Sequence, residues 1–278
     1  MSTEVHTKEG AGILATFLDE QIAAFIALGT TLRDSPLARV ARLHPLLVAV
    51  IEDAISIRLL GDASRLNQAY VISRALLERL TNFCFLQLCT DGEFEDFFDY
   101  TLNKIGRRMD RSVEAAGQVK ARIALRDGEF QLPPEIAAAV AKFTSERGRE
   151  KTRWTTVSLP DRAAVVEAKL GGSSGLFISL LTIYADASEA LHGTIYGAVF
   201  HLGAYDVGAV PHDQDSLDRH RYSTLACLYL MAGGAMDTLL SLLHALGEPN
   251  VFEAASASKS RFKLAAVRCG LVAAKQKP

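Results

Sequence analysis

Apolar residues recur every three or four positions through most of this chain, which is the spacing of one face of an α-helix. The first such run covers residues 12–32, and two more cover residues 36–60 and 65–89. Thr90 or Asp91 then caps a further helix that is rich in phenylalanine. The pattern predicts long helices joined by short turns.

Later segments continue this pattern. The phenylalanine-rich helix becomes polar and basic from Lys104 and is expected to continue to about Arg126. Shorter helices are expected at residues 134–147 and 160–170, and a strongly apolar helix at residues 176–202. No stretch shows the sustained alternation that is typical of a strand. The sequence therefore predicts an all-α fold, a single helical bundle of about seven to nine helices with a partly projecting charged helical region.

The chain is expected to contain one domain with two polar ends. Residues 1–10 are polar and predict a disordered N-terminus, and residues 11–255 predict the helical-bundle domain. Residues 256–278 are weakly apolar and predict a basic C-terminal tail. The basic residues of this tail are Lys259, Arg261, Lys263, Arg268 and Lys275.

Composition is that of an ordinary ordered protein, with 49% hydrophobic and 22% charged residues. The formal charge of −2 argues against sequence-independent binding of nucleic acid by the protein surface as a whole. Residues 104–126 form a local basic face, so nucleic-acid binding there remains an alternative. The four cysteines lack metal-ligand spacing, which favours a reducing compartment and hence the cytoplasm. No metal and no cofactor are expected.

Residues 222–246 form a nearly continuous apolar run that is long enough to be a membrane-spanning helix or a buried core helix. Asp237 and His244 interrupt it, and an aspartate at the centre of a span costs about 2.5–3.5 kcal/mol. We expect a buried core helix here and no membrane partner.

Two polar stripes are the candidate site. Tyr184, Ser188 and His192 follow one another at four-residue steps in an apolar helix, and each step keeps nearly the same helix face. An unpaired buried polar group costs about 1–3 kcal/mol, so a second helix is expected to supply partners. In residues 70–82, the polar residues Arg74, Glu78 and Asn82 repeat at the same four-residue step. The predicted ligand-binding residues are Arg74, Glu78, Asn82, Tyr184, Ser188 and His192.

Several chemistries suit these residues. Arg74 is a permanent cation that can clamp a carboxylate or phosphate. His192 is a candidate general acid or base, with Glu78 or a tyrosine as its orienting partner, and Ser188 is a candidate nucleophile without a nucleophile elbow. The catalytic candidates are therefore His192, Glu78, Arg74, Ser188 and Tyr184. The alternative is a satisfied polar network that fixes helix register in a structural interaction module.

The order of these residues is similar to a known pattern. An Arg-x-x-x-Glu helix, a tryptophan and a Tyr-x-x-x-Ser-x-x-x-His-Gly helix resemble a bacterial all-helical family catalogued only as a domain of unknown function. The matching positions are Arg74, Glu78, Trp154, Tyr184, Ser188 and His192, within roughly residues 35–245. The resemblance implies no reaction.

A second motif gives an alternative function. Arg39 and His44 fit the Arg-x4–6-His pattern of HEPN nucleases. That resemblance would imply metal-independent RNA cleavage, usually across a homodimer, in a toxin or phage-defence effector. Pro45, directly after the histidine, is awkward inside a helix. The favoured function remains the binding of a small or anionic ligand in a regulatory or defence-related role.

Overall fold

The computed structural model describes residues 4–124, 131–172, 175–192, 194–199 and 213–271. The chain divides into two compact units, each described by itself below. Unit 1 contains residues 1–88 and 159–278, and unit 2 contains residues 89–158. The predicted all-α class is confirmed, with one small two-stranded sheet in unit 2.

Unit 1 is entirely helical over its described residues. Its elements are α1 (Lys8–Arg33), α2 (Ala38–Arg42), α3 (His44–Asp62), α4 (Leu66–Leu86), α7 (Leu159–Lys169), α8 (Leu176–Ser179), the π-helix η1 (Leu180–Tyr184), α9 (Ala185–Leu191), α10 (Ile195–Val199), α11 (Gln214–Ala245) and α12 (Phe252–Arg268).

The core of unit 1 lies where α1, α3, α4 and α11 pack together. Phe17 and Phe25 of α1 and Leu76 and Leu80 of α4 are buried because they fall on the inward faces that the helical spacing predicts. Gly233 of α11 lies against the ring of Phe17, and a Cβ at that position would collide with the ring. A residue without a side chain therefore lets α1 and α11 approach closely.

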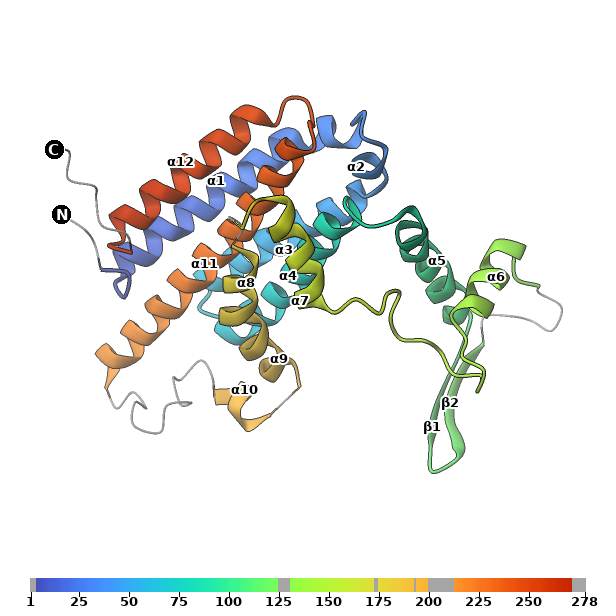
Figure 1. Ribbon diagram of the computed structural model, residues 1–278. Helices are drawn as coiled ribbons and strands as arrows, with labels where there is room; N and C mark the ends of the chain where they lie inside the picture. Colours follow the sequence, from blue (N-terminus) through green and yellow to red (C-terminus); the bar gives the residue numbers. More distant parts are fainter. Residues whose placement is uncertain (1–3, 125–130, 173–174, 193, 200–212, 272–278) are drawn as a thin grey trace. The chain divides into compact units, whose positions relative to one another are not determined.

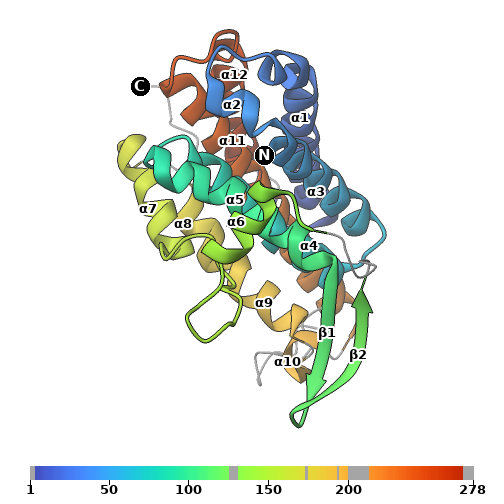
Figure 2. The ribbon, with the colours of Figure 1, turned by 90° about the vertical axis from the view of Figure 1, so that its right-hand side faces the viewer.

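The C-terminal segment differs from the expected tail. Residues 252–268 form α12, which runs beside α1 and α11 (Figures 1 and 2). The Phe262 ring lies 5.8 Å from the Phe17 ring, and Ser258 is buried between Gln21 and Asp237, with both of which it forms hydrogen bonds of 2.5 Å. The inward positions of α12 are mostly alanine and serine, so its hydrophobic pattern is weak. Residues 272–278 of the predicted tail lie outside the described residues.

The apolar helix expected at residues 176–202 is interrupted. It consists of α8, the π-turn η1, α9 and α10, and its last positions, 200–202, lie outside the described residues. A π-turn adds a residue to the helical repeat and therefore rotates the following residues around the helix axis. The π-turn ends at Tyr184, and the four-residue step from Tyr184 to Ser188 and His192 then runs through α9.

Unit 2 contains α5 (Asp91–Arg108), β1 (Asp110–Ala115), β2 (Gln118–Ala124) and α6 (Pro134–Lys142), and α6 packs on α5 (Figure 2). Thr90 caps α5 as predicted. The helix expected to run to about Arg126 ends at Arg108 instead, and an antiparallel hairpin follows.

The turn of this hairpin is Ala116-Gly117, with φ of 52° and 73°. Two positive φ values are the geometry that twisted hairpins require, but the turn sequence is not among those that favour it most.

Two helices of unit 1, α1 and α11, are long and apolar enough to cross a membrane by length and composition alone. This is weak evidence, because core helices of soluble proteins pass the same test. The apolar window of α11 is 67% buried inside the structure, and that of α1 is 50% buried.

Candidate functional site

The structure brings together three of the predicted site residues, Arg74, Glu78 and Tyr184. Arg74 and Glu78 share a face of α4, and Tyr184 is the last residue of η1, which packs against α4. The Tyr184 hydroxyl donates to Oε1 of Glu78 at 2.6 Å and accepts from Nη2 of Arg74 at 3.2 Å. The Arg74 guanidinium also lies 4.8 Å from the centre of the Tyr184 ring, which is a cation–π contact.

Charge within this cluster is balanced. Nε of Arg74 lies 3.8 Å from Oε1 of Glu78, so the two side chains offset each other. Burial raises the pKa of Tyr184, the Glu78 carboxylate raises it further, and Arg74 opposes both effects. The phenol therefore stays protonated at neutral pH and acts as a hydrogen-bond donor.

One guanidinium nitrogen of Arg74 is buried without a hydrogen-bond acceptor among the residues that the structure describes. Nη1 is buried and forms no hydrogen bond with any residue in the described part of the chain. A buried N–H group without an acceptor costs about 1–3 kcal/mol, and more for a charged group. Arg74 therefore retains a buried N–H donor whose hydrogen-bonding capacity the described residues do not use.

Unit 1 contains a second arginine that packs on a tyrosine ring, and all guanidinium nitrogens of this arginine are hydrogen-bonded. Arg58 lies 5.1 Å from the ring centre of Tyr229. Its Nε and Nη2 donate to Asp19 at 2.7 and 3.2 Å, and its Nη1 donates to Asp62 at 2.8 Å and to the Tyr229 hydroxyl at 3.3 Å. Every guanidinium nitrogen of Arg58 has an acceptor, whereas the buried Nη1 of Arg74 has none among the described residues.

The other predicted site residues do not join this cluster. Asn82 accepts a hydrogen bond from Arg162 of α7, and the Ser188 hydroxyl donates to the backbone oxygen of Tyr184 at 2.7 Å. His192 is exposed at the C-terminal end of α9. The residues of the two predicted stripes thus take part in several separate contacts and do not form one site. Arg162 was missed because a contact between α4 and α7 has no signature in the local sequence.

The Arg39 and His44 side chains are bonded to backbone carbonyls of two different helices. Nη1 of Arg39 donates to the oxygen of Leu86, the last residue of α4, at 2.9 Å. Nε2 of His44 lies 3.1 Å from the oxygen of Gly29 in α1. Cations commonly satisfy the last carbonyls of a helix in this way, so the contact gives Arg39 a capping role.

An apolar pocket of about 380 Å³ lies between α4 and the α9–α10 region. Val71 and Ile72 of α4 line it, together with Leu60, Asn67, Gln68, Ala190 and Gly197. Val71 precedes Arg74 by three residues, which is about 4.5 Å along the helix axis. The pocket therefore begins about one helical turn from Arg74 along α4.

Comparison with known proteins identifies a family and no function. A model described as "Family of unknown function (DUF5677)" matches residues 40–208, which is more than half of the chain. This range contains Arg74, Glu78 and Tyr184 and begins one residue after Arg39. Neither a curated protein nor a solved structure matches the chain. The predicted resemblance to a domain of unknown function is confirmed.

Proposed function

Because this chain belongs to the DUF5677 family, whose function is unknown, we propose its function from the site itself: unit 1 binds a small carboxylate ligand at Arg74. The observation that carries the proposal is the buried Nη1 of Arg74, which has no acceptor among the described residues. A carboxylate oxygen accepting from Nη1 would remove the cost of the unpaired donor. Arginine forms short and strong charge-assisted hydrogen bonds with such groups.

The charge of the cluster favours a singly charged ligand. Glu78 already offsets one positive charge, at 3.8 Å from Nε of Arg74. A doubly charged phosphate would meet the repulsion of Glu78 with only one cation to offset it. A carboxylate adds a single negative charge to a neutral cluster, in which the Tyr184 hydroxyl already donates its proton to Glu78.

The neighbouring pocket suggests what the rest of the ligand is like. Its lining includes Leu60, Val71, Ile72 and Ala190, so an apolar body of a few carbon atoms would be buried there. The proposed ligand is therefore a small amphipathic acid. We place this binding function in the cytoplasm, a location supported by the four free thiols, and propose a regulatory role for it.

Calorimetric titration with a series of straight-chain carboxylates tests the proposal. We expect heat of binding to rise with chain length and to vanish for the matched alcohols and for inorganic phosphate. Arg74→Gln is expected to abolish binding, because it removes the cation and the free donor. Tighter binding of phosphate than of any carboxylate would contradict the proposed ligand class.

Arg58→Gln is the matched control, since Arg58 occupies the same kind of position over a tyrosine with all nitrogens paired. It is expected to reduce stability and leave ligand affinity unchanged. Unchanged carboxylate binding by a folded Arg74→Gln variant would show that the ligand site lies elsewhere.

A further inference from the structure

Unit 2 carries a concentration of basic residues at the C-terminal end of α5, away from the Arg74 cluster in the sequence. Helix α5 carries its five acidic residues between Asp91 and Asp99 and its three basic residues between Lys104 and Arg108. This arrangement suits the helix dipole, which favours acids at the N-terminus and bases at the C-terminus. It also concentrates positive charge where α5 leads into the hairpin.

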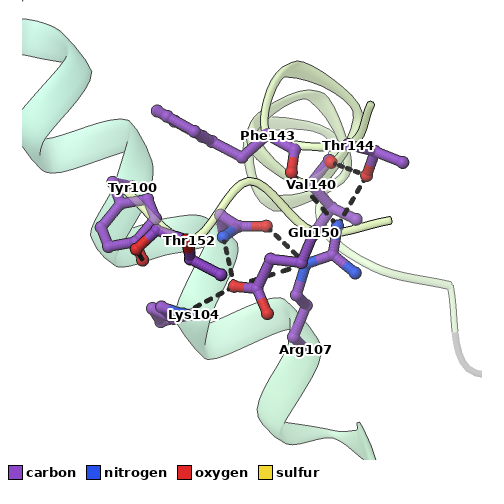
Figure 3. Close-up of polar contacts among 9 residues, drawn as sticks. Tyr100, Lys104, Arg107, Val140, Phe143, Thr144, Glu150 and Thr152 are labelled. Atoms are coloured by element: carbon purple, nitrogen blue, oxygen red, sulfur yellow. Dashed lines mark hydrogen bonds and ion pairs between the residues drawn. The ribbon is translucent and has the colours of Figure 1, made fainter. Parts of the chain in front are cut away.

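A second basic segment is held against this end of α5, as Figure 3 shows. Oε1 of Glu150 accepts from Nζ of Lys104 at 2.7 Å and from Nδ2 of the buried Asn103 at 3.2 Å. The Tyr100 hydroxyl donates to the backbone oxygen of Thr152 at 2.7 Å. These bonds fasten the segment of residues 144–152 to α5.

Arg107 completes the attachment. Its Nε donates to Oδ1 of Asn103 at 2.8 Å, and its Nη2 donates to the Thr144 hydroxyl at 2.6 Å (Figure 3). Burial by itself raises the pKa of Glu150, but Lys104, Asn103 and Arg107 outweigh that effect and hold the pKa below its usual value. Glu150 is thus a fixed anion that organises the surrounding cations.

The result is a cleft of about 620 Å³ with excess positive charge. It is lined by Lys104, Arg107, Arg108, Asp110, Arg111, Ser112 and Glu150. Lys104 is paired with Glu150, and Asp110 forms two bonds with Arg122 at 2.9 and 2.6 Å.

Arg108 and Arg111 are exposed and form no ion pair with any residue that the structure describes. The fastened segment and the residue that follows it contribute further exposed bases, which are Arg147, Arg149, Lys151 and Arg153.

The hairpin adds an apolar surface next to these cations. The strand register pairs Arg111 with Ile123 and Val113 with Ala121, so these four side chains share one face of the hairpin. The register shifts between Val113 and Glu114, so the alternation that places Ala121 and Ile123 on this face does not extend to Val119. Val113 and Ile123 are 64% and 63% exposed. Exposed aliphatic side chains beside a basic surface are typical of an interaction site.

We propose that this cleft and hairpin face of unit 2 bind a single-stranded nucleic acid, with the phosphates on the arginines and the bases on the aliphatic side chains. Repeated phosphates match repeated cations, and each neutralised phosphate releases counterions. A single strand is favoured over a duplex because only unpaired bases offer their apolar faces to Val113 and Ile123. The proposal concerns unit 2 and does not depend on carboxylate binding in unit 1.

Fluorescence anisotropy with the full chain tests this proposal. The probes are labelled oligouridylate and oligothymidylate of about twelve nucleotides, a length within the known site sizes of single-strand binding domains. We expect both to bind at about 50 mM salt, and the affinity to fall steeply by about 200 mM. The double variant Arg108→Glu, Arg111→Glu is expected to weaken binding at least about tenfold and to reduce the salt slope by about 1.4, which is two phosphate contacts at 0.7 each.

The double variant Lys259→Glu, Lys263→Glu is the matched control, because it makes the same charge change at two exposed positions of α12 in unit 1. It is expected to bind like wild type. Circular dichroism should show both double variants folded, since none of the four side chains is buried.

Three results would overturn the proposal. They are no binding of either oligonucleotide by wild type at low salt, equal weakening by the two double variants, and binding of polyglutamate or a duplex as tight as that of the single strands. Binding of the RNA probe alone would support the proposal and add recognition of the 2′-hydroxyl.

Discussion

Tyr184 donates a hydrogen bond of 2.6 Å to Glu78 and thereby joins η1 to α4. The same hydroxyl accepts from Arg74 at 3.2 Å, so one phenol orients both charged residues of the cluster. A π-turn is an uncommon element that recurs at functional sites, and here it ends on the residue that makes these contacts. The relationship makes Tyr184 the positioning residue for the proposed ligand site.

Replacing Tyr184 by phenylalanine tests this relationship. We expect Tyr184→Phe to lower the free energy of unfolding by about 1–2 kcal/mol, because a half-buried carboxylate loses its donor. The measurement is urea denaturation followed by circular dichroism. Tyr229→Phe is the control, since the Tyr229 hydroxyl has only a 3.3 Å contact with an arginine that keeps its aspartate partners. A larger loss for Tyr229→Phe than for Tyr184→Phe would contradict this account.

The cluster shows how far sequence reasoning reaches. Arg74 and Glu78 could be placed together because a regular helix fixes a four-residue step, and Tyr184 could be matched to them because buried polar groups need partners. The partners of Ser188 and His192 could not be predicted, because Ser188 bonds to the backbone of its own helix and His192 is exposed where α9 ends, and the apolar pattern marks neither outcome. An apolar run such as residues 176–192 reads as one continuous helix.

Two other differences have local physical causes. The hairpin of residues 110–124 was missed because its turn, Ala116-Gly117, lacks the asparagine or aspartate that usually marks such turns. Helix α12 was missed because small residues such as Ala255 and Ser258 form its inward face, and these carry little hydrophobic signal. Close packing of small side chains is a property of the partner helices as much as of the segment itself.

Asp237 gives a prediction about pH. Burial raises its pKa, and the hydrogen bond from Ser258 only partly opposes this effect. The folded state therefore holds the Asp237 proton more tightly than the unfolded state, so this group lowers stability as the pH rises above the usual aspartate value.

Asp237→Asn should remove this contribution and make stability less sensitive to pH between about 4 and 7. Urea denaturation across that range is the measurement. Asp34→Asn is the control, because the Arg33 hydrogen bond lowers the pKa of exposed Asp34, so its contribution to stability changes mainly below about pH 4 and the profile between about 4 and 7 should match that of wild type. An unchanged pH profile in Asp237→Asn would contradict the assigned burial effect.

The hairpin face predicts a separate effect on nucleic acid. The double variant Val113→Ser, Ile123→Ser removes the aliphatic contacts and keeps every cation of the cleft. We expect weaker oligonucleotide binding with an unchanged salt slope, because no phosphate contact is lost. Anisotropy titrations at several salt concentrations measure both quantities. A reduced salt slope with unchanged affinity at low salt would assign the hairpin to phosphate contacts instead.

His44 separates the nuclease alternative from a structural role. Its ring nitrogen Nε2 lies 3.1 Å from the Gly29 oxygen and thereby joins α3 to α1. His44→Ala is expected to lower the free energy of unfolding by about 1 kcal/mol, because the bond is lost and a carbonyl loses its donor. His192→Ala is the control, since His192 is exposed and its side chain has no hydrogen bond with a described residue, so a change within about 0.5 kcal/mol is expected.

RNA cleavage assays on the same preparations provide the functional readout. We expect wild type, His44→Ala and His192→Ala to leave RNA uncut, because the His44 ring is engaged by a backbone carbonyl and Arg39 is bonded to the end of a different helix. A wild-type protein that cuts RNA, together with a folded but inactive His44→Ala variant, would establish the nuclease. The carboxylate site at Arg74 would then be a second function of unit 1, since neither Arg39 nor His44 is among its residues.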